Sequence, residues 1–408
     1  MKSKNKPASS KLTILRQICQ LIPGHLTVQL ARAHGIEARG FSPWSHVVAM
    51  LYAQVSRAMS LNDVCDGLAI AQNALGEIRG ATRPSRNGLS HSNRERNADM
   101  AEALYWSVAE QLCAGHRGFA RQHPGRNYAY RFKRPIELVD ATTIQLVANC
   151  LDWAQHRRRK AAVKCHLRLD LQTFLPRCVI IDTAKEHEVS RARELCTGLA
   201  AGEIAVFDKG YMDFEHLQSL DARGIGWVTR AKDNLAYELL EERPPQGEKI
   251  LHDRVIQFKH YNAKQAYPQP LRWVQARVQV DGQEEVLEFI TNNLQWAGSS
   301  VADLYRCRWQ IEVFFKSLKQ NLQLGAMLGY NANAVRWQIW MALLVHLLLR
   351  FISWKSHWSS HFGRLCTLVR CTLWLRWDLE SCLQFYGTAG RKRRMRANAQ
   401  QAYLPGFL

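Results

Sequence analysis

Acidic residues are scarce in this sequence. Its 408 residues include 35 Asp and Glu against 55 Lys and Arg, which gives a formal net charge of +20 at pH 7 and a pI near 9.7. Such a positive excess favours a polyanionic partner, either nucleic acid or an anionic membrane surface. With 47% hydrophobic and 22% charged residues the chain is globular and not disordered, and its length suggests two or three domains.

The chain also lacks the residue spacings of a zinc site. None of the eleven cysteines forms a CxxC pair, and the fifteen histidines include no HExxH motif. A structural or catalytic zinc site of those kinds is therefore not expected. Scattered cysteines in odd number indicate reduced thiols, and no signal peptide is recognised at the N-terminus, so we expect a cytoplasmic protein.

No hydrophobic run reaches the length of a membrane span. The most apolar stretch, residues 339–352, is interrupted by His346 and Arg350, whereas a spanning helix needs about 20 mostly apolar residues. We therefore predict a buried core helix at this position and no membrane partner. Nucleic acid remains as the expected polyanion.

Changes in sequence texture divide the chain into five segments. The first has 19 Lys and Arg against 8 Asp and Glu, and its residues 76–97, rich in Gly, Arg, Ser and Asn, suit a turn or a loop that contacts phosphates. Alternation of strand and helix patterns later in the chain predicts an α/β sheet of mixed direction. In order, we expect a helical N-terminal DNA-binding domain (1–134), the first part of the α/β domain (135–235), a β-rich insertion (236–285), the second part of the α/β domain (286–350) and a helical, basic C-terminal region (351–408).

One predicted helix carries several polar groups on one side. At about 100° of turn per residue, a stripe about 60° wide collects four side chains, Tyr305, Arg308, Glu312 and Lys319, apart from an apolar face. A carboxylate flanked by cations and a phenol suits a surface that binds metal and phosphate. A solvated amphipathic helix with ordinary i,i+4 ion pairs explains the same segment equally well.

Two aspartates follow apolar strand patterns. Asp140 ends IELVD and Asp208 ends IAVFD. A carboxylate at a strand end can reach a shared site at the edge of the sheet, although Asp is also common at strand ends and turns. Together with Glu312, on a basic protein, they form the set of hard oxygen ligands that Mg²⁺ or Mn²⁺ needs for phosphoryl transfer with two ions.

These segments resemble the DDE transposases of one large group of bacterial insertion sequences, which carry a Y-R-E-K signature. The spacing of Tyr305, Arg308, Glu312 and Lys319 matches that signature, and LVDATTI and VFDKGY resemble the two aspartate motifs. KCH at 164–166, TRAKDN at 229–234 and TNN at 291–293 resemble further landmarks of the family. Ala141 departs from the pattern, since relatives more often have Gly or Ser there, but the ligand is the preceding carboxylate.

The resemblance implies an RNase H-like catalytic fold interrupted by the β-rich insertion. It implies that Asp140, Asp208 and Glu312 hold Mg²⁺ or Mn²⁺, as two ions, and that Tyr305, Arg308 and Lys319 bind DNA phosphates. In relatives an aromatic side chain of the insertion can stack on a flipped base. Trp273 is the candidate for that role here, with a core position as the alternative.

The resemblance further implies a cut-and-paste transposase that binds the ends of its own element and performs metal-dependent cleavage and strand transfer. We expect a homodimer on double-stranded DNA, located in the bacterial cytoplasm with the nucleoid. Arg157 and Arg158, in a basic turn, either track the DNA backbone or belong to a solvated turn. Two alternatives stay open: an RNase H-like endonuclease without strand transfer, and a non-catalytic DNA-binding relative.

Overall fold

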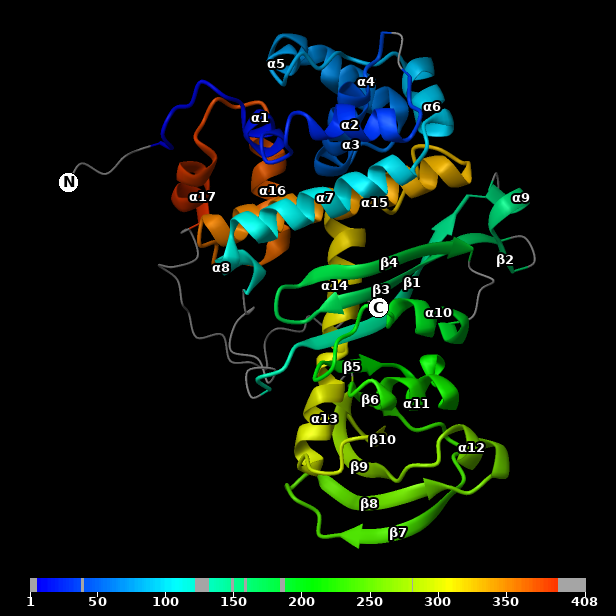
Figure 1. Cartoon of the computed structure of the whole chain (residues 1–408). Coiled ribbons are helices and arrows are strands. Elements are labelled where there is room, and N and C mark those ends of the chain that lie inside the picture. The colour runs from blue at the N-terminus through cyan, green and yellow to red at the C-terminus, as the bar shows by residue number, and fades with distance from the viewer. Residues whose placement is uncertain are drawn as a thin grey trace, which may run out of the picture. The chain divides into compact units, whose positions relative to one another are not determined.

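The computed structural model describes residues 6–37, 40–121, 132–147, 150–157, 160–183, 188–280 and 282–387 (Figure 1). The chain divides into two compact units. The helical unit comprises Met1–Gly115, Ser317–Gly329 and Asn333–Leu408. The sheet unit comprises His116–Lys316 and Tyr330–Ala332.

Helices form nearly all the regular structure described in the helical unit. Helix α3 shows how the sequence starts them: Ser42 accepts a hydrogen bond from the backbone of Ser45, and Pro43 occupies the first turn. The helices are α1 (Ile14–Cys19), α2 (Leu26–Ala33), α3 (Pro43–Ser56), α4 (Leu61–Ile70), α5 (Gln72–Gly76), α6 (Arg86–Glu95), α7 (Asp99–Gly115), α15 (Ala332–Lys355), α16 (Phe362–Thr372) and α17 (Leu379–Gly387).

Helix α15 is the core of this unit. It is apolar on most sides, and its Trp337 and Trp340 are buried. By length and composition α15 could cross a membrane, but 89% of its most apolar window is buried inside the protein. The prediction of a core helix at residues 339–352 is therefore confirmed.

Helix α6 corrects the prediction of a loop over residues 76–97. Ser85 caps the helix by accepting a hydrogen bond from Gly88 N at 3.0 Å. Leu89, Ser92 and Asn93 then form a buried face. The polar composition of the segment concealed this helix, because only one large apolar side chain marks its inner side.

A single sheet organises the sheet unit. Its ten described strands are β1 (Ile136–Leu146), β2 (Gln155–Arg157), β3 (Lys160–Asp170), β4 (Leu175–Thr183), β5 (Ile204–Phe207), β6 (Gly226–Arg230), β7 (Tyr237–Arg243), β8 (Ile250–Phe258), β9 (Leu271–Val280) and β10 (Gln283–Thr291). The strand order is β2-β3-β1-β5-β6-β10-β9-β8-β7, and β4 pairs with β3 on the side of that path.

The sheet has mixed direction, as the sequence predicts. Strand β1 pairs antiparallel with β3, and β3 pairs antiparallel with β4. Strands β5 and β6 run parallel to β1, whereas β10, β9, β8 and β7 continue the sheet in antiparallel pairs (Figure 1). The unit therefore contains an antiparallel part, a parallel centre and a second antiparallel part within one sheet.

Helices pack on this sheet and close its core. The helices of the unit are α8 (Arg117–Ala120), α9 (Leu151–Ala154), α10 (Glu188–Leu195), α11 (Phe214–Ala222), α12 (Tyr261–Ala266) and α13 (Gly298–Cys307), with the 3₁₀ turn η3 (Lys209–Tyr211) and the first part of α14 (Trp309–Asn321). Leu195 of α10 and Leu217 of α11 join Phe207 and Trp227 in one buried cluster. Trp273 of β9 belongs to the same cluster, so the second antiparallel part shares its core with the parallel centre.

A buried ion pair fixes the approach to helix α13. Arg272 on β9 donates its Nε to Asp253 Oδ1 on β8 at 2.8 Å, and both side chains are at least 95% buried. The same guanidinium donates to the carbonyl oxygens of Leu294 and Trp296, just before α13 begins. One arginine thus joins two strands to the loop that leads into the helix.

Candidate active site

The register of two parallel strands places Asp140 and Asp208 together. Strands β1 and β5 pair in parallel from Ile136 to Val139, and their last partners are Val139 and Phe207. Asp140 follows Val139 and Asp208 follows Phe207, so both residues lie where the pairing of the two strands ends. The prediction that Asp208 follows a strand is confirmed, because β5 ends at Phe207.

Asp140 is not at a strand end, contrary to the prediction. Strand β1 continues to Leu146 because it keeps its antiparallel partner β3, up to the pair Leu146 and Ala161. Only the pairing with β5 stops at Val139. Asp140 therefore lies at the point where β1 loses its partner on one side, which opens space for its side chain.

Helices α13 and α14 supply the third acid and its neighbours. The two helices meet at Arg308, whose backbone is itself helical (φ −53°, ψ −35°). Leu304, Cys307 and Ile311 bury the apolar side of this junction. Their burial turns the predicted polar stripe toward the end of the parallel strands.

Arg308 links two of the three acids. Its Nη1 donates to Asp140 Oδ2 at 2.8 Å, and its Nη2 donates to Glu312 Oε1 at 2.6 Å. The side chains of Arg308 and Asp140 are each 18% exposed, and that of Glu312 is 35% exposed. Because the guanidinium is planar with its donors in a fixed fork, it holds the two carboxylates in a defined arrangement.

Tyr305 binds the remaining acid. Its hydroxyl donates to Asp208 Oδ1 at 3.0 Å. The ring lies 4.9 Å from the ring of Phe289 on β10, centroid to centroid, and the Arg308 guanidinium lies over it at 5.7 Å. The structure therefore brings Tyr305, Arg308 and all three acids into one network.

Burial sets the protonation of this network. It is the largest cause that raises the pKa of Asp140 to about 6, and the negative charges of Asp208 and Glu312 add to the effect. The Arg308 guanidinium opposes it. Burial also raises the pKa of Tyr305, so the phenol stays protonated and remains a donor.

Arg308 stays charged in this environment. Burial acts to lower its pKa, but the neighbouring Tyr305, Asp140 and Glu312 outweigh burial, and the pKa is raised. A permanent cation therefore lies between two carboxylates. It partly relieves the repulsion among the three acids.

The acids suit a divalent cation by their donor chemistry. Carboxylate oxygens are hard ligands, and the contribution of Asp208 and Glu312 to the pKa of Asp140 reflects a repulsion that a bound cation would relieve. In the described residues, however, no three His, Cys, Asp or Glu side chains are grouped closely enough to hold a metal ion. Arg308 takes up one oxygen of Asp140 and one of Glu312 in this arrangement.

The other residues predicted to contact DNA are Lys319, Arg157, Arg158 and Trp273. Lys319 lies on α14 about two turns beyond Glu312. Arg157 ends β2, but its side chain and the whole of Arg158 lie outside the described residues. Trp273 is only 3% exposed and packs beside Tyr237, under the guanidinium of Arg254. Base stacking by Trp273 would require this packing to open.

Two of the remaining motif segments link neighbouring strands of the sheet. Lys209 of VFDKGY forms an ion pair with Asp233 of TRAKDN at 3.0 Å, next to Asp208. Asn292 of TNN accepts a hydrogen bond from Trp227 N at 3.0 Å and donates to Ile225 O at 2.9 Å. The first contact joins the segments that follow β5 and β6, whereas Asn292 joins the end of β10 to the start of β6, at the other end of the parallel strands from Asp208.

The sequence analysis missed the contribution of Phe289. Its ring packs on Tyr305 and comes from β10, outside every motif that the sequence displays. The only signal in the sequence is its place in the strand pattern VLEFIT, which predicts burial but no partner. The link of Arg308 to both acids was equally hidden, because a helical stripe does not identify what faces it.

Comparison with known proteins identifies the family of this chain. Residues 131–348 match the family model described as "Transposase DDE domain", and residues 10–78 match a "Domain of unknown function (DUF4372)". The chain is 28% identical over 301 residues to the "Putative transposase y4zB" of Sinorhizobium fredii, covering 72% of this chain and 79% of that protein.

Two further relatives are more partial matches. The "Probable transposase for insertion sequence element IS5377" of Geobacillus stearothermophilus is 28% identical, covering 54% of this chain and 58% of that protein. "Transposase InsG for insertion sequence element IS4" of Escherichia coli is 23% identical, covering 51% and 49%.

A solved piggyBac transposase complex with hairpin DNA is 9% identical to this chain. It covers 96% of this chain and 84% of its own, with a TM-score of 0.44. The family match does not depend on that likeness, since it rests on the sequence of residues 131–348, more than half of the 408. By that match and by its curated relatives, the chain belongs to the transposase DDE domain family and is a DNA transposase of the bacterial insertion-sequence kind.

Proposed function

We propose that this transposase cuts DNA at the ends of its own insertion sequence and joins them to target DNA, with Asp140, Asp208 and Glu312 as the catalytic acids. The observation that carries the proposal is the strand register, which places two acids side by side where β1 and β5 stop pairing. The contact of Arg308 with Asp140 and Glu312 supports the inclusion of the third acid.

The three acids would hold Mg²⁺ or Mn²⁺, as two ions. When bound, these ions would activate the attacking oxygen and stabilise the leaving oxygen of an in-line displacement. Tyr305 orients Asp208 through its hydroxyl group. Arg308 neutralises Asp140 and Glu312 before DNA arrives, and its fork of N–H donors also matches phosphate oxygens.

The strand order supports an RNase H-like reading of the catalytic part. Three antiparallel strands, β4, β3 and β1, lie next to the parallel strands β5 and β6. Residues 135–235 and 286–350 would form this domain, and residues 236–285 would be its β-rich insertion. Residues 1–134 would recognise the element ends, with residues 351–408 as a basic C-terminal region.

The proposal extends to the remaining DNA contacts and to assembly. Lys319, Arg157 and Arg158 would bind backbone phosphates, and Trp273 would reach a base only if the insertion rearranges on DNA. Paired ends must be cut together, so we expect a homodimer on double-stranded DNA. The excess of positive charge would keep the protein with the nucleoid in the bacterial cytoplasm.

The decisive experiment incubates the purified protein with its element ends, their flanks and Mg²⁺ or Mn²⁺. Asp140→Asn, Asp208→Asn and Glu312→Gln should each abolish cutting at the element boundary and still bind DNA. Glu284→Gln is the matched control, because it removes the same negative charge from an exposed side chain. Glu284 Oε1 lies 3.7 Å from Arg277 Nε.

The products separate this proposal from its alternatives. Joined products establish strand transfer, whereas metal-dependent cuts without joining indicate an endonuclease. Binding without cuts by the wild-type protein indicates a non-catalytic relative. Cutting that persists in all three acid variants would show that the catalytic residues lie elsewhere.

A further inference from the structure

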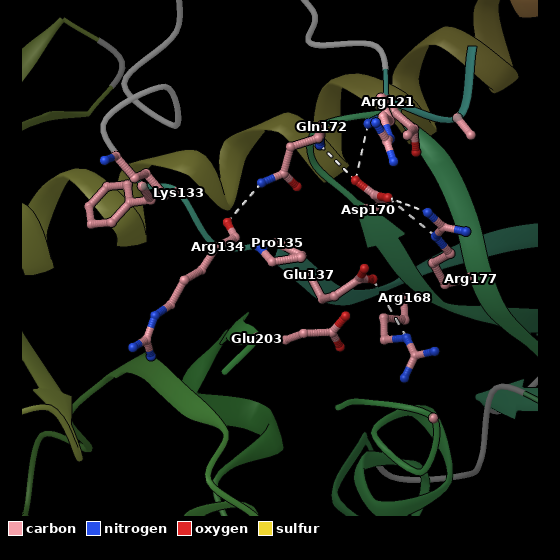
Figure 2. Close-up of a pocket in the computed structure, with 14 residues that line it drawn as sticks. Arg121, Lys133, Arg134, Pro135, Glu137, Arg168, Asp170, Gln172, Arg177 and Glu203 are labelled. Carbon is pink, nitrogen blue, oxygen red and sulfur yellow. Dashed lines mark hydrogen bonds and ion pairs between the residues drawn. The ribbon is translucent and has the colours of Figure 1, made fainter. Parts of the chain in front are cut away.

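A second site of unusual chemistry lies inside the sheet unit. It is a cavity of about 670 Å³ with several basic side chains in its lining, Arg121, Lys133, Arg134, Arg168 and Arg177 (Figure 2). None of the proposed catalytic acids contributes to it, and of the IELVD segment only Glu137 does. The charges of this cavity therefore need an explanation of their own.

The cavity lies at the opposite end of the parallel strands from the proposed acids. Glu203, in its lining, comes just before β5, and Asp208 comes just after it. Five residue steps along an extended strand cover about 16 Å. Glu137 likewise precedes Asp140 on the parallel strand β1. The cavity and the catalytic network are thus separate sites on the same strands.

The inner wall of the cavity holds an incompletely satisfied arginine. The side chain of Arg168 on β3 is only 9% exposed, and neither its Nε nor its Nη1 has a hydrogen-bond partner. The nearest carboxylate oxygen, Glu137 Oε2, lies 3.6 Å from Nε and is itself without a hydrogen bond (Figure 2). A buried guanidinium in this state is destabilising unless an acceptor reaches it.

Glu137 does little to oppose an anion. Burial is the largest cause that raises its pKa to about 8, and the charge of Asp170 adds to the effect. Arg168 opposes the shift without reversing it. Near neutral pH this carboxyl is mostly protonated, so it adds little negative charge beside Arg168 and can donate a hydrogen bond.

The other carboxylates of the cavity have partners of their own. Asp170 accepts hydrogen bonds from Arg177 Nε and Nη2 at 3.2 and 2.6 Å, and from the backbone of Gln172 and Thr173. Glu203 accepts one from Ala200 N at 2.9 Å. Asp170 is thus paired with Arg177, and Glu203 leaves one negative charge against the four remaining cations of the lining.

Three cations at the mouth carry unbalanced charge. Arg121, Lys133 and Arg134 are exposed, and no ion pair engages their side chains within the described residues. They line the same cavity as the buried guanidinium of Arg168. An arrangement of exposed cations around a buried, under-bonded arginine suits a tetrahedral oxyanion, because phosphate oxygens are acceptors only.

We propose that this cavity is a second phosphate site of the transposase, which binds a phosphodiester of the DNA away from the bond that is cut. Arg168 would donate hydrogen bonds to the phosphate oxygens at the inner wall, and Arg121, Lys133 and Arg134 would hold the adjoining backbone. The inference does not depend on which acids catalyse the reaction, because it concerns DNA binding alone.

Salt dependence of DNA binding tests the proposal. The probe is a fluorescein-labelled duplex of arbitrary sequence, titrated with the full chain in EDTA across a range of KCl concentrations, so that no cleavage occurs. The variants are the triple substitution Arg121→Gln, Lys133→Gln, Arg134→Gln at the mouth and, separately, Arg168→Gln. Lys259→Gln is the control, because Lys259 is an exposed lysine of the same unit outside the cavity.

Loss of one phosphate contact should lower the slope of log K against log salt by about 0.9, which is about an eightfold loss of affinity at 0.1 M salt. We expect this change in Arg168→Gln, up to about three times this change in the triple variant, which removes three proposed contacts, and no change in Lys259→Gln. Should Arg168→Gln fail to fold, the exposed triple variant still decides the question.

Three results would overturn the proposal. The first is a wild-type slope in the folded triple variant. The second is an equal loss of DNA affinity in Lys259→Gln, which would mean that the net charge of the protein, and not this cavity, sets the affinity. The third is binding of inorganic phosphate, measured by calorimetry and lost in the triple variant, without any change in DNA slope; the cavity would then take a free anion and not DNA.

Discussion

Single side chains of the proposed catalytic network bond to groups that DNA and metal would need. Arg308 donates to two carboxylates that are proposed metal ligands, and Tyr305 donates to the third. In the proposed reaction Arg308 has to release a carboxylate before it can bind a phosphate with the same N–H group. The contacts of these two residues therefore describe the protein before its substrates bind.

Removal of the Tyr305 hydroxyl should separate catalysis from folding. Tyr305→Phe loses the hydrogen bond to Asp208, and we expect cleavage to fall roughly 10–100-fold, as for other partners that orient a metal ligand. The unfolding free energy should fall by only about 1 kcal/mol. Rates of boundary cleavage and urea denaturation measure the two effects.

Tyr267→Phe is the matched control for that prediction. Tyr267 is also buried and donates to an aspartate, Asp221, at 3.1 Å, but it lies outside the catalytic network. Its substitution should cost a similar amount of stability and leave the cleavage rate unchanged. Equal effects of both substitutions on cleavage would remove the special role of Tyr305.

The raised pKa of Asp140 predicts a pH-dependent gain in stability on its removal. The pKa of Asp140 is about 6 in the folded protein against an ordinary 3.8. Between pH 3.8 and pH 6 the folded state therefore keeps a proton on Asp140 that the unfolded state loses. The contribution of Asp140 to the free energy of unfolding therefore falls as the pH rises through this range. In EDTA, Asp140→Asn should raise the unfolding free energy by about 1–3 kcal/mol at pH 7.5 and by almost nothing near pH 4.

Thermal denaturation at both pH values measures this difference. Glu284→Gln, an exposed change of the same type, should alter neither transition. An Asp140→Asn protein that is less stable than wild type at pH 7.5 would mean that the ion pair with Arg308 outweighs the cost of burial.

Elements whose signals are local were predicted closely from the sequence. The apolar run at residues 204–207 predicts a strand, which is β5, and the apolar spacing of residues 214–223 predicts a helix, which is α11, Phe214–Ala222. An apolar run bounded by turn residues, or a helical period behind a capping Asp, is contained in the segment itself. The aspartate that follows β5 could therefore be placed from the sequence.

Elements that depend on partners distant in the sequence could not be predicted from the sequence. The extension of β1 to Leu146 exists because β3 pairs with it, and α6 is stabilised by burial of Leu89. The bond between Arg308 and Asp140 joins a helix to a strand that are 168 positions apart. Residues of several strands and loops line the cavity around Arg168, so no single segment of the sequence predicts it.

The buried pair of Asp253 and Arg272 should dominate the stability of the strands before α13. Asp253→Ala leaves the Arg272 guanidinium buried without its partner, and we expect a loss of about 3–5 kcal/mol in unfolding free energy. The exposed pair of Glu238 and Lys264, at 3.5 Å, is the control, and Glu238→Ala should cost less than about 1 kcal/mol. Similar midpoints in urea for the two variants would contradict this assignment.

At the scale of the whole molecule, net charge governs the encounter with DNA. A chain with a formal charge of +20 attracts any duplex before specific contacts form. If 6–10 phosphates are contacted, affinity for a duplex of arbitrary sequence should fall about 10³–10⁵-fold between 50 and 200 mM salt. Fluorescence anisotropy over that range measures the fall, and a flat profile would argue against broad phosphate contact.

Helix α14 fixes the direction of Lys319 relative to Glu312. It carries Glu312 within the sheet unit and, past Lys316, continues into the helical unit with Lys319. One residue inserted after Lys316 would advance the following residues by about 1.5 Å and rotate them by about 100° relative to Glu312. Four inserted residues would nearly restore the phase. Insertions after Lys316 should therefore lower boundary cleavage most at the lengths that turn Lys319 away from the side of the helix that carries Glu312.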